Sequence, residues 1–281
     1  AFVGFGTKAA VFPMYAWLPA ASVAPTPVTA LLHAVAVVNA GAYAVLRVIY
    51  YSFGASFLYG TWAQTVALLL SCFTILFGST MAVREQHFKR RLAYSTISNL
   101  SYMLMGAALM TPDGMTGSLS HLVIHGVIKI TLFYCAGAIL IKTGKEYVQS
   151  IGMQQLLLIF VINTAMLGSI ALVGTPPLAG FVSKWNLLTA ASATELPMGT
   201  VAIVCLIISA ILTAIYLFTA ALPMYFRPLN ADQAQLAGQK LDPSWMMLVP
   251  MGILCALMIG LGLWSQPLVT FLRNISAGVI F

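Results

Sequence analysis

Hydrophobic runs of about 20 residues or more, separated by short polar segments, fill almost the whole sequence. A helix that crosses a membrane needs about 20 apolar residues, because the hydrocarbon layer is about 30 Å thick. The pattern predicts an all-α, polytopic transmembrane helix bundle with about eight spans. The predicted spans are 1–22, 27–51, 60–83, 90–111, 116–142, 151–192, 198–226 and 243–274.

Two of these spans contain helix-breaking residues. The first span carries Pro13 and Pro19, and the sixth, which is too long for one simple crossing, is interrupted by GTPPLAG at 174–180. Unwound backbone inside a membrane is tolerated only where it is buried in protein or faces water. Two broken helices therefore indicate a transport site near the middle of the membrane.

Composition supports the same class of protein. The 281 residues are 60% hydrophobic and only 7% charged, whereas soluble domains carry about 25% charged residues. A water-soluble globular protein is excluded. The sequence begins with Ala1, without an initiator methionine or a secretory leader, so we expect a piece of a longer chain.

The net charge of +7 is distributed as a topology signal. Basic residues gather in the loops 84–91, 142–147 and 227–242, whereas Asp113 and Glu195 lie in loops on the opposite side. Loops rich in lysine and arginine are cytoplasmic in most membrane proteins. We therefore place these three loops on the cytoplasmic side and expect lipid, not nucleic acid, around the chain.

Six ionisable residues are predicted to lie deep inside spans, where no acidic residue accompanies them. They are Lys8, His33, His121, His125, Lys129 and Lys184. An ionisable group at mid-membrane costs several kcal/mol on insertion scales, less if it faces a wet cavity. Such a cost indicates a function.

Three of the six follow one another at four-residue intervals in SHLVIHGVIKITLF, residues 120–133. His121, His125 and Lys129 fall within an arc of about 80° and rise about 12 Å along a helix. A zinc site is disfavoured because a protonated lysine is a poor ligand and no carboxylate or thiolate is placed to help. Histidines bonded to neighbouring hydroxyls, with a snorkelling lysine, are a structural alternative. A proton relay fits best, because histidine changes charge near neutral pH.

The remaining candidates lie near the broken spans. Lys184 follows GTPPLAGF and can meet freed carbonyl groups, either as a proton carrier or as a charge that caps the helix end. Lys8 precedes Pro13 by five residues, and His33 lies two turns inside the second span, where a packed core residue is an equal alternative.

No cofactor motif is visible in the chain. The four cysteines are solitary, and there is no dinucleotide fingerprint, phosphate-binding loop or nucleophile–base set. We therefore expect no bound cofactor, no metal and no catalytic site of the chain's own.

Four stretches carry a resemblance to a known family. The chain resembles the antiporter-like membrane subunits of complex I (NADH:quinone oxidoreductase), of membrane-bound hydrogenases and of Mrp cation/proton antiporters. The stretches are KAAVFPMYAWLPAASVAPTPVTALLHA (8–34), KRRLAYSTISNLSYM (89–103), SHLVIHGVIKITLF (120–133) and GTPPLAGFVSK (174–184).

The resemblance implies a role for each matching residue. Lys8 corresponds to the central lysine of the family's proton channel, and His33 belongs to the same channel. Lys89 corresponds to the lysine of K-R-x-L-A-Y-S, and Lys184 to the terminal exit-channel lysine. The ladder of His121, His125 and Lys129 matches as a unit. Two departures are His87, where many relatives have an acidic residue, and Trp185, where some branches have one.

The resemblance also implies the domain organisation. Family members have about fourteen spans in two inverted five-helix repeats. Residues 1–51 would then end the first repeat, 60–226 would form the second, and 243–281 would contain a closing helix. The family's acidic partner of Lys8 lies in an N-terminal half that the given residues do not include.

These implications lead to a function hypothesis. We expect a proton-translocating subunit of a larger, redox-driven membrane complex in a prokaryotic cytoplasmic membrane, with other membrane subunits as partners. An Mrp-type Na⁺/H⁺ antiporter subunit is the first alternative, although the spans contain no carboxylate for Na⁺. A non-conducting membrane scaffold is the second.

Overall fold

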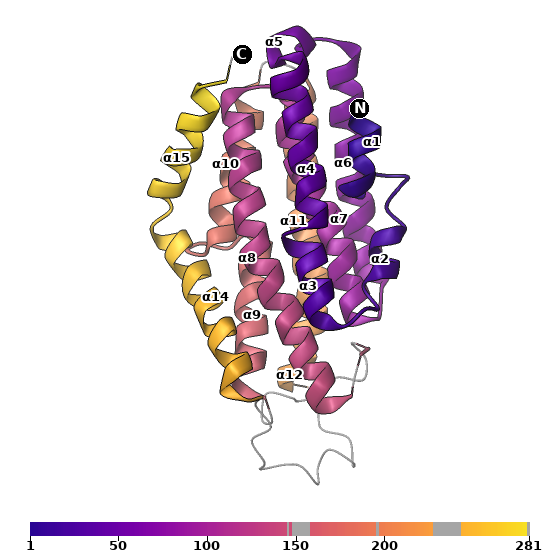
Figure 1. The fold of residues 1–281 in the computed structure, drawn as a ribbon, viewed down its shortest axis with the longest axis vertical. Helices are drawn as coiled ribbons and strands as arrows, with labels where there is room; N and C mark the ends of the chain where they lie inside the picture. The colour runs from indigo at the N-terminus through magenta and orange to yellow at the C-terminus, as the bar shows by residue number, and fades with distance from the viewer. Residues whose placement is uncertain (145, 148–157, 195–196, 227–242, 280–281) are drawn as a thin grey trace.

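The computed structural model describes residues 1–144, 146–147, 158–194, 197–226 and 243–279. The helices lie roughly along one common direction (Figure 1). Their bounds are α1 Phe2–Lys8, α2 Trp17–Ala21, α3 Thr26–Ala34, α4 Val37–Arg47, the π-helix η1 Val48–Phe53, α5 Ala55–Leu58, α6 Trp62–Arg84, α7 Phe88–Ala108, α8 Pro112–Thr143, α9 Ile159–Val173, α10 Ala179–Ser192, α11 Pro197–Ala221, α12 Pro223–Phe226, α14 Trp245–Leu263 and α15 Gln266–Ala277.

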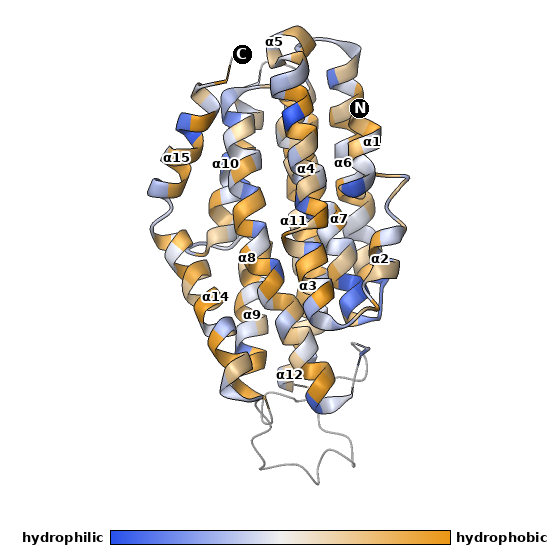
Figure 2. Cartoon of the chain, in the orientation of Figure 1, coloured by the Kyte–Doolittle hydropathy of each residue, from blue (hydrophilic) through white to orange (hydrophobic). Residues whose placement is uncertain are grey.

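The predicted all-α transmembrane class is confirmed, and the chain is an integral membrane protein. In the described part of the chain, five helical stretches are long and apolar enough to cross a membrane on their own. These stretches are Thr26–Phe53, Trp62–Arg84, Pro112–Thr143, Pro197–Phe226 and Trp245–Leu263. Apolar residues make up most of the helical ribbon (Figure 2), as expected for helices of a membrane-spanning bundle.

Helix α8 is the central element of the bundle. It has 32 residues and contacts α3, α7, α9, α10, α14 and α15. Local sequence sets both of its ends. The Thr111 hydroxyl accepts a hydrogen bond from the Gly114 N–H, Pro112 opens the first turn, and Gly144 ends the helix with a φ of 66°. A positive φ suits glycine, which has no Cβ to clash.

Both predicted helix breaks are present. The first span divides into α1, which ends at Lys8, and α2, which begins at Trp17. The sixth divides into α9 and α10 around Gly174, whose φ is 95°. The predicted start of the sixth span at residue 151 lies outside the described residues.

Two further spans are also divided, which corrects the expectation of only two broken helices. The second span is interrupted between α3 and α4, where the Val35 and Ala36 N–H groups both bond to the Leu31 carbonyl. The Asn39 side chain donates to the Ala34 carbonyl instead. A side chain inserted into the backbone hydrogen bonds of a helix is a recognised cause of a kink. No proline lies at this kink to predict it from the sequence.

The last predicted span, 243–274, consists of α14 and α15, with the break at Trp264 and Ser265. Pro267 in the first turn of α15 lacks an N–H, and in a continuous helix its ring would clash with the carbonyl of Leu263, four residues earlier and the last residue of α14. A proline at a helix start therefore divides a run that hydropathy alone presents as continuous.

Candidate functional site

Lys129 lies at the centre of the bundle and has no exposed surface. Its Nζ donates to the Leu92 carbonyl oxygen at 2.9 Å and to the Ser95 hydroxyl at 2.8 Å, both on α7. Among the described residues no aspartate or glutamate is buried. The lysine is therefore solvated by neutral dipoles, so its charge is not neutralised by a carboxylate of the described chain. A buried amine in such surroundings can exist with or without its proton.

The two histidines of the predicted ladder stack one turn apart on α8. The rings of His121 and His125 are 5.8 Å apart. His121 Nδ1 is 2.9 Å from the Ser183 hydroxyl of α10. His121 Nε2 and both ring nitrogens of His125 have no hydrogen-bond partner among the described residues. Buried polar atoms are normally paired with protein or water, so these three nitrogens mark places that polar groups or water would fill.

Lys184 occupies the break between α9 and α10. Its Nζ donates to the Leu172 carbonyl at 2.8 Å and to the Val173 carbonyl at 2.9 Å. These are final carbonyls of α9, which have no partner within their helix and form its negative end. The half-buried Lys184 side chain also places its Nζ 5.4 Å from the centre of the Tyr102 ring. Lys184 therefore caps the end of the broken helix while its amine faces the bundle interior. This geometry fits both predicted roles, a helix-capping charge and a proton carrier.

The backbone of α10 places Lys184 there. A Cβ at Gly180 would lie only 1.7 Å from the Ala171 carbonyl oxygen. Helix α10 can therefore cross the end of α9 this closely only because residue 180 is glycine. Lys184, one turn later on α10, then reaches the end of α9.

His33 joins the same buried region from α3. It has no exposed surface, its ring stacks on Phe133 with centroids 5.0 Å apart, and neither ring nitrogen has a partner among the described residues. It is close enough to Lys129 for an electrostatic interaction. The Lys129 and Lys184 ammonium groups interact with each other in the same way. Lys129 is thus the shared electrostatic neighbour of His33 and Lys184.

A set of hydroxyl groups runs beside the histidines, between α6, α7 and α11. The Ser95 hydroxyl, which accepts from Lys129, also bonds to the Tyr216 hydroxyl. Further along, the Tyr102 hydroxyl donates to Ser209 at 2.7 Å, and Ser209 contacts two more buried serines, Ser79 and Ser98.

Tyr102 connects this set to the histidines. Its ring meets His121 edge-on, with centroids 5.5 Å apart, and it lies below Lys184. Hydroxyls both donate and accept hydrogen bonds, and they form two groups here: Ser95 with Tyr216 beside Lys129, and Tyr102 with Ser209, Ser79 and Ser98 beside Lys184 and His121.

Two predicted site residues lie apart from this core. Lys8, at the end of α1, is exposed and is not enclosed by the other helices of the described chain. Its backbone packs on α4, where a Cβ at Gly41 would be 2.7 Å from the Lys8 Cβ. Lys89 is buried in the first turn of α7, and its Nζ donates to the Ala24 carbonyl at 3.3 Å.

Similarity to known proteins identifies the family of the chain. The family model described as NADH:quinone oxidoreductase/Mrp antiporter, TM, matches residues 1–213. The chain belongs to this antiporter family.

Among the family's curated members, NADH-quinone oxidoreductase subunit N of Desulforudis audaxviator (strain MP104C) is 31% identical over 280 residues, which are 95% of this chain and 54% of that protein. Subunit L of Campylobacter jejuni is 36% identical over 236 residues, 83% of this chain and 37% of that protein. The chain thus spans about half, or less, of the curated relatives it matches.

Solved structures show the same fold. A chain of the Mrp complex from Dietzia sp. DQ12-45-1b has a TM-score of 0.86 at 22% identity, covering 99% of this chain and 58% of that one. A chain of respiratory complex I from Thermus thermophilus has a TM-score of 0.81 at 24% identity, covering 98% and 56%.

In this antiporter-family chain, sequence reasoning missed the buried Arg91 and the hydroxyl groups that surround the predicted site residues. Arg91 was assigned to a basic loop, but it is buried and donates to the carbonyls of Glu85 and Tyr216 and to the Thr219 hydroxyl. The polar stretch STISNLSY, residues 95–102, was the available signal for the hydroxyl set. It places serines, a threonine, an asparagine and a tyrosine inside a span, where polar side chains are costly.

In the described ranges, no group of three or more histidine, cysteine, aspartate or glutamate side chains is arranged to hold a metal ion. The two stacked histidines contact aromatic rings and a serine.

Proposed function

We propose that this chain conducts protons as part of an antiporter-like subunit in a larger membrane complex. One observation carries the proposal: Lys129 is completely buried, yet within the described part of the chain its amine is bonded only to a carbonyl and a hydroxyl. Intramembrane ionisable residues that survive this cost generally line ion or proton pathways. The names of the relatives, subunits N and L of NADH-quinone oxidoreductases, support a multi-subunit setting.

The path would run through the described core. Between Lys129 and Lys184 the proton would pass along the histidine stack on α8 or, in parallel, along the hydroxyl groups around Ser95 and Tyr102. Like charges repel strongly where the dielectric is low. Protonation of Lys129 therefore disfavours protonation of Lys184, so a proton arriving at one lysine helps to release the proton from the other. No bound cofactor is required for this exchange, and redox or ion energy would come from partner subunits.

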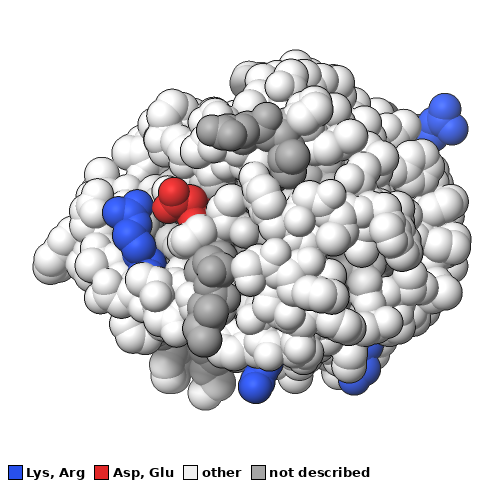
Figure 3. Space-filling model, turned by 90° about the horizontal axis from the view of Figure 1, so that it is seen from above, with Lys and Arg blue, Asp and Glu red and all other residues white. Residues whose placement is uncertain are grey.

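The orientation is also a proposal. The segments 84–91 and 142–147 meet at one end of the bundle, where the Phe88 N–H donates to the Glu146 carbonyl oxygen at 2.9 Å; the third predicted loop, 227–242, lies outside the described residues. The opposite end shows scattered Lys and Arg side chains and an acidic patch among mostly uncharged atoms (Figure 3). This asymmetry supports a cytoplasmic location for the basic end.

Replacement of Lys184 by methionine tests the path at its outer lysine. The full-length protein in its complex would be reconstituted into vesicles, and proton movement followed by a pH-sensitive dye. We expect flux to fall on the order of 10-fold, less than the ~10²-fold of a fully positioned proton-transfer group, because the site is only half-buried. Lys142→Met, at an exposed lysine of α8, is the matched control.

Wild-type flux in Lys184→Met would contradict the role of this residue. Replacing Na⁺ by K⁺ in the same assay separates proton conduction from Na⁺/H⁺ exchange. Flux that requires Na⁺ would favour exchange, which the buried residues of the described chain do not otherwise support because they provide no carboxylate for Na⁺.

A further inference from the structure

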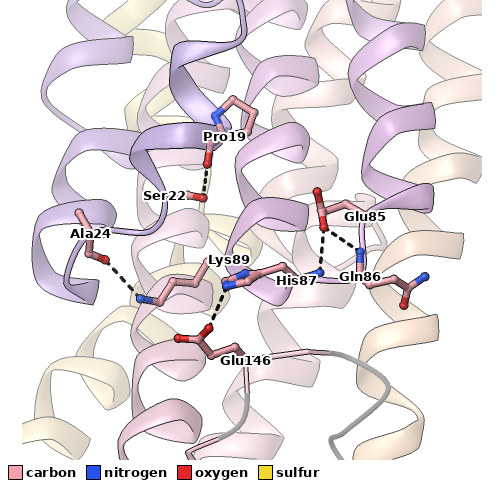
Figure 4. Close-up of polar contacts among 8 residues, drawn as sticks. All are labelled: Pro19, Ser22, Ala24, Glu85, Gln86, His87, Lys89 and Glu146. Atoms are coloured by element: carbon pink, nitrogen blue, oxygen red, sulfur yellow. Dashed lines mark hydrogen bonds and ion pairs between the residues drawn. The ribbon is translucent and has the colours of Figure 1, made fainter.

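Lys89, at the basic end of the bundle, lies beside two titratable side chains that sequence reasoning did not connect with it. Figure 4 shows His87 and Lys89 at the start of α7 with Glu146, which follows α8 in the sequence by three residues. His87 Nε2 and a Glu146 carboxylate oxygen are 3.3 Å apart. Glu146 also interacts electrostatically with Lys89. A carboxylate, an imidazole and an ammonium group thus gather from two chain segments.

The three side chains differ in their access to water. The Glu146 side chain is 45% exposed and the His87 side chain 12%, whereas Lys89 is 6% exposed. Exposure decreases from the carboxylate toward the lysine. A cavity of about 10 Å³ lies among them, bounded by Ala136 and Leu140 of α8. Its size is on the scale of a single water molecule, which can bridge polar groups that do not touch directly.

The Lys89 amine donates to the Ala24 carbonyl oxygen (Figure 4), while the backbone of α7 continues from Lys89 into the bundle. Leu92 and Ser95, three and six residues later, both accept hydrogen bonds from Lys129. Six helical residues correspond to a rise of about 9 Å. Along α7, the cluster therefore lies within two helical turns of Ser95, which accepts a hydrogen bond from Lys129.

We propose that Glu146, together with His87, collects protons from the aqueous phase and passes them to Lys89. This inference rests on the proposed proton conduction. The carboxylate takes a proton from water and becomes a neutral acid, then transfers it through His87 or a bridging water to the unprotonated Lys89 amine. The carboxylate is regenerated, and Lys89 becomes the ammonium form. Net movement is one proton inward.

A purely structural role for the pair is the competing explanation. An exposed ion pair contributes little to stability. The connection between the two segments is already made by backbone, through the Phe88 N–H and the Glu146 carbonyl oxygen. Removing the charge of the side chain leaves this backbone hydrogen bond in place.

The test compares three variants of the full-length protein in its reconstituted complex: Glu146→Gln, Glu85→Gln and Lys129→Met. Glu85 is the matched control, because it is an acid at the same end whose Oε1 accepts from the Gln86 and His87 N–H groups, and glutamine retains that acceptor. We expect Glu146→Gln to lower proton flux on the order of 10-fold, the low end of what a local charge does to ion arrival rates. Glu85→Gln should retain the wild-type flux.

Buffer concentration provides a second measurement that a structural role would not change. Raising the concentration of a membrane-impermeant buffer supplies protons to Lys89 by another carrier and should restore flux in Glu146→Gln. Wild-type flux in Glu146→Gln, an equal loss in Glu85→Gln, or a loss that buffer does not relieve would each overturn the inference. If Lys129→Met also conducts normally, the proposed function itself is wrong; if only Glu146→Gln does, the entry site alone is wrong.

Discussion

Methionine in place of Lys129 is expected to reduce proton flux through the reconstituted complex by at least ~10²-fold, the lower end of what a positioned proton-transfer group contributes. Methionine has a similar length but carries no titratable proton. The site is completely buried, so bulk water cannot replace the lost amine, in contrast to the half-buried Lys184.

The same substitution should leave the fold intact. The Leu92 carbonyl still accepts from the Thr96 hydroxyl, and Ser95 still bonds to Tyr216, so neither former partner of the lysine becomes isolated. Replacing a buried ion by an apolar group of similar volume is often neutral or stabilising. Assembly of the complex by size-exclusion chromatography and the thermal midpoint in detergent check this expectation. Normal flux in a correctly assembled Lys129→Met complex would remove the central residue from the proposed path.

Alanine in place of Gly180 is expected to lower the free energy of unfolding by about 1–3 kcal/mol, as overpacking of a well-packed interior does. The added methyl group would lie 1.7 Å from the Ala171 carbonyl oxygen, so α10 must move away from α9. Lys184 would move with α10 and lose its bonds to Leu172 and Val173. We therefore expect reduced proton flux together with reduced stability, although residue 180 carries no titratable group.

Gly260→Ala is the matched control for this prediction. No atom lies within 4 Å of a Cβ built at Gly260 in α14, so alanine should gain up to ~1 kcal/mol of helix propensity without displacing a neighbour. Thermal unfolding in detergent and flux in vesicles measure both variants. An unchanged thermal midpoint in Gly180→Ala would show that the close crossing of α9 and α10 does not position Lys184.

Two features of the site follow from short stretches of sequence alone. The spacing of His121, His125 and Lys129 predicted a common helix face, and the structure stacks the two histidine rings on α8. GTPPLAG predicted the break beside Lys184. Both predictions depend only on helix geometry and on the backbone limits of glycine and proline, which act within a few residues.

Other parts of the site could not be predicted because they depend on partners far away in the chain. The interruption after Ala34 arises from the Asn39 side chain and leaves no hydropathy signal. Lys8 was expected to be buried, but burial requires neighbouring helices, and in the described chain it is exposed. In the sequence, Glu146 is an acidic residue of the basic loop 142–147, and only the fold places it beside His87.

The sequence by itself determined that this chain is a membrane-spanning helix bundle, where its first and sixth spans break, and which titratable residues it places within the spans. These properties follow from the thickness of the membrane and the helical repeat, which any single segment must obey. Only the tertiary structure decided that Lys129 meets Ser95, that His121 meets Ser183, and that Lys184 meets the end of α9. Each of these contacts joins two different helices. Such contacts depend on how the helices pack at sites such as Gly180, and the sequence of one helix does not specify that packing.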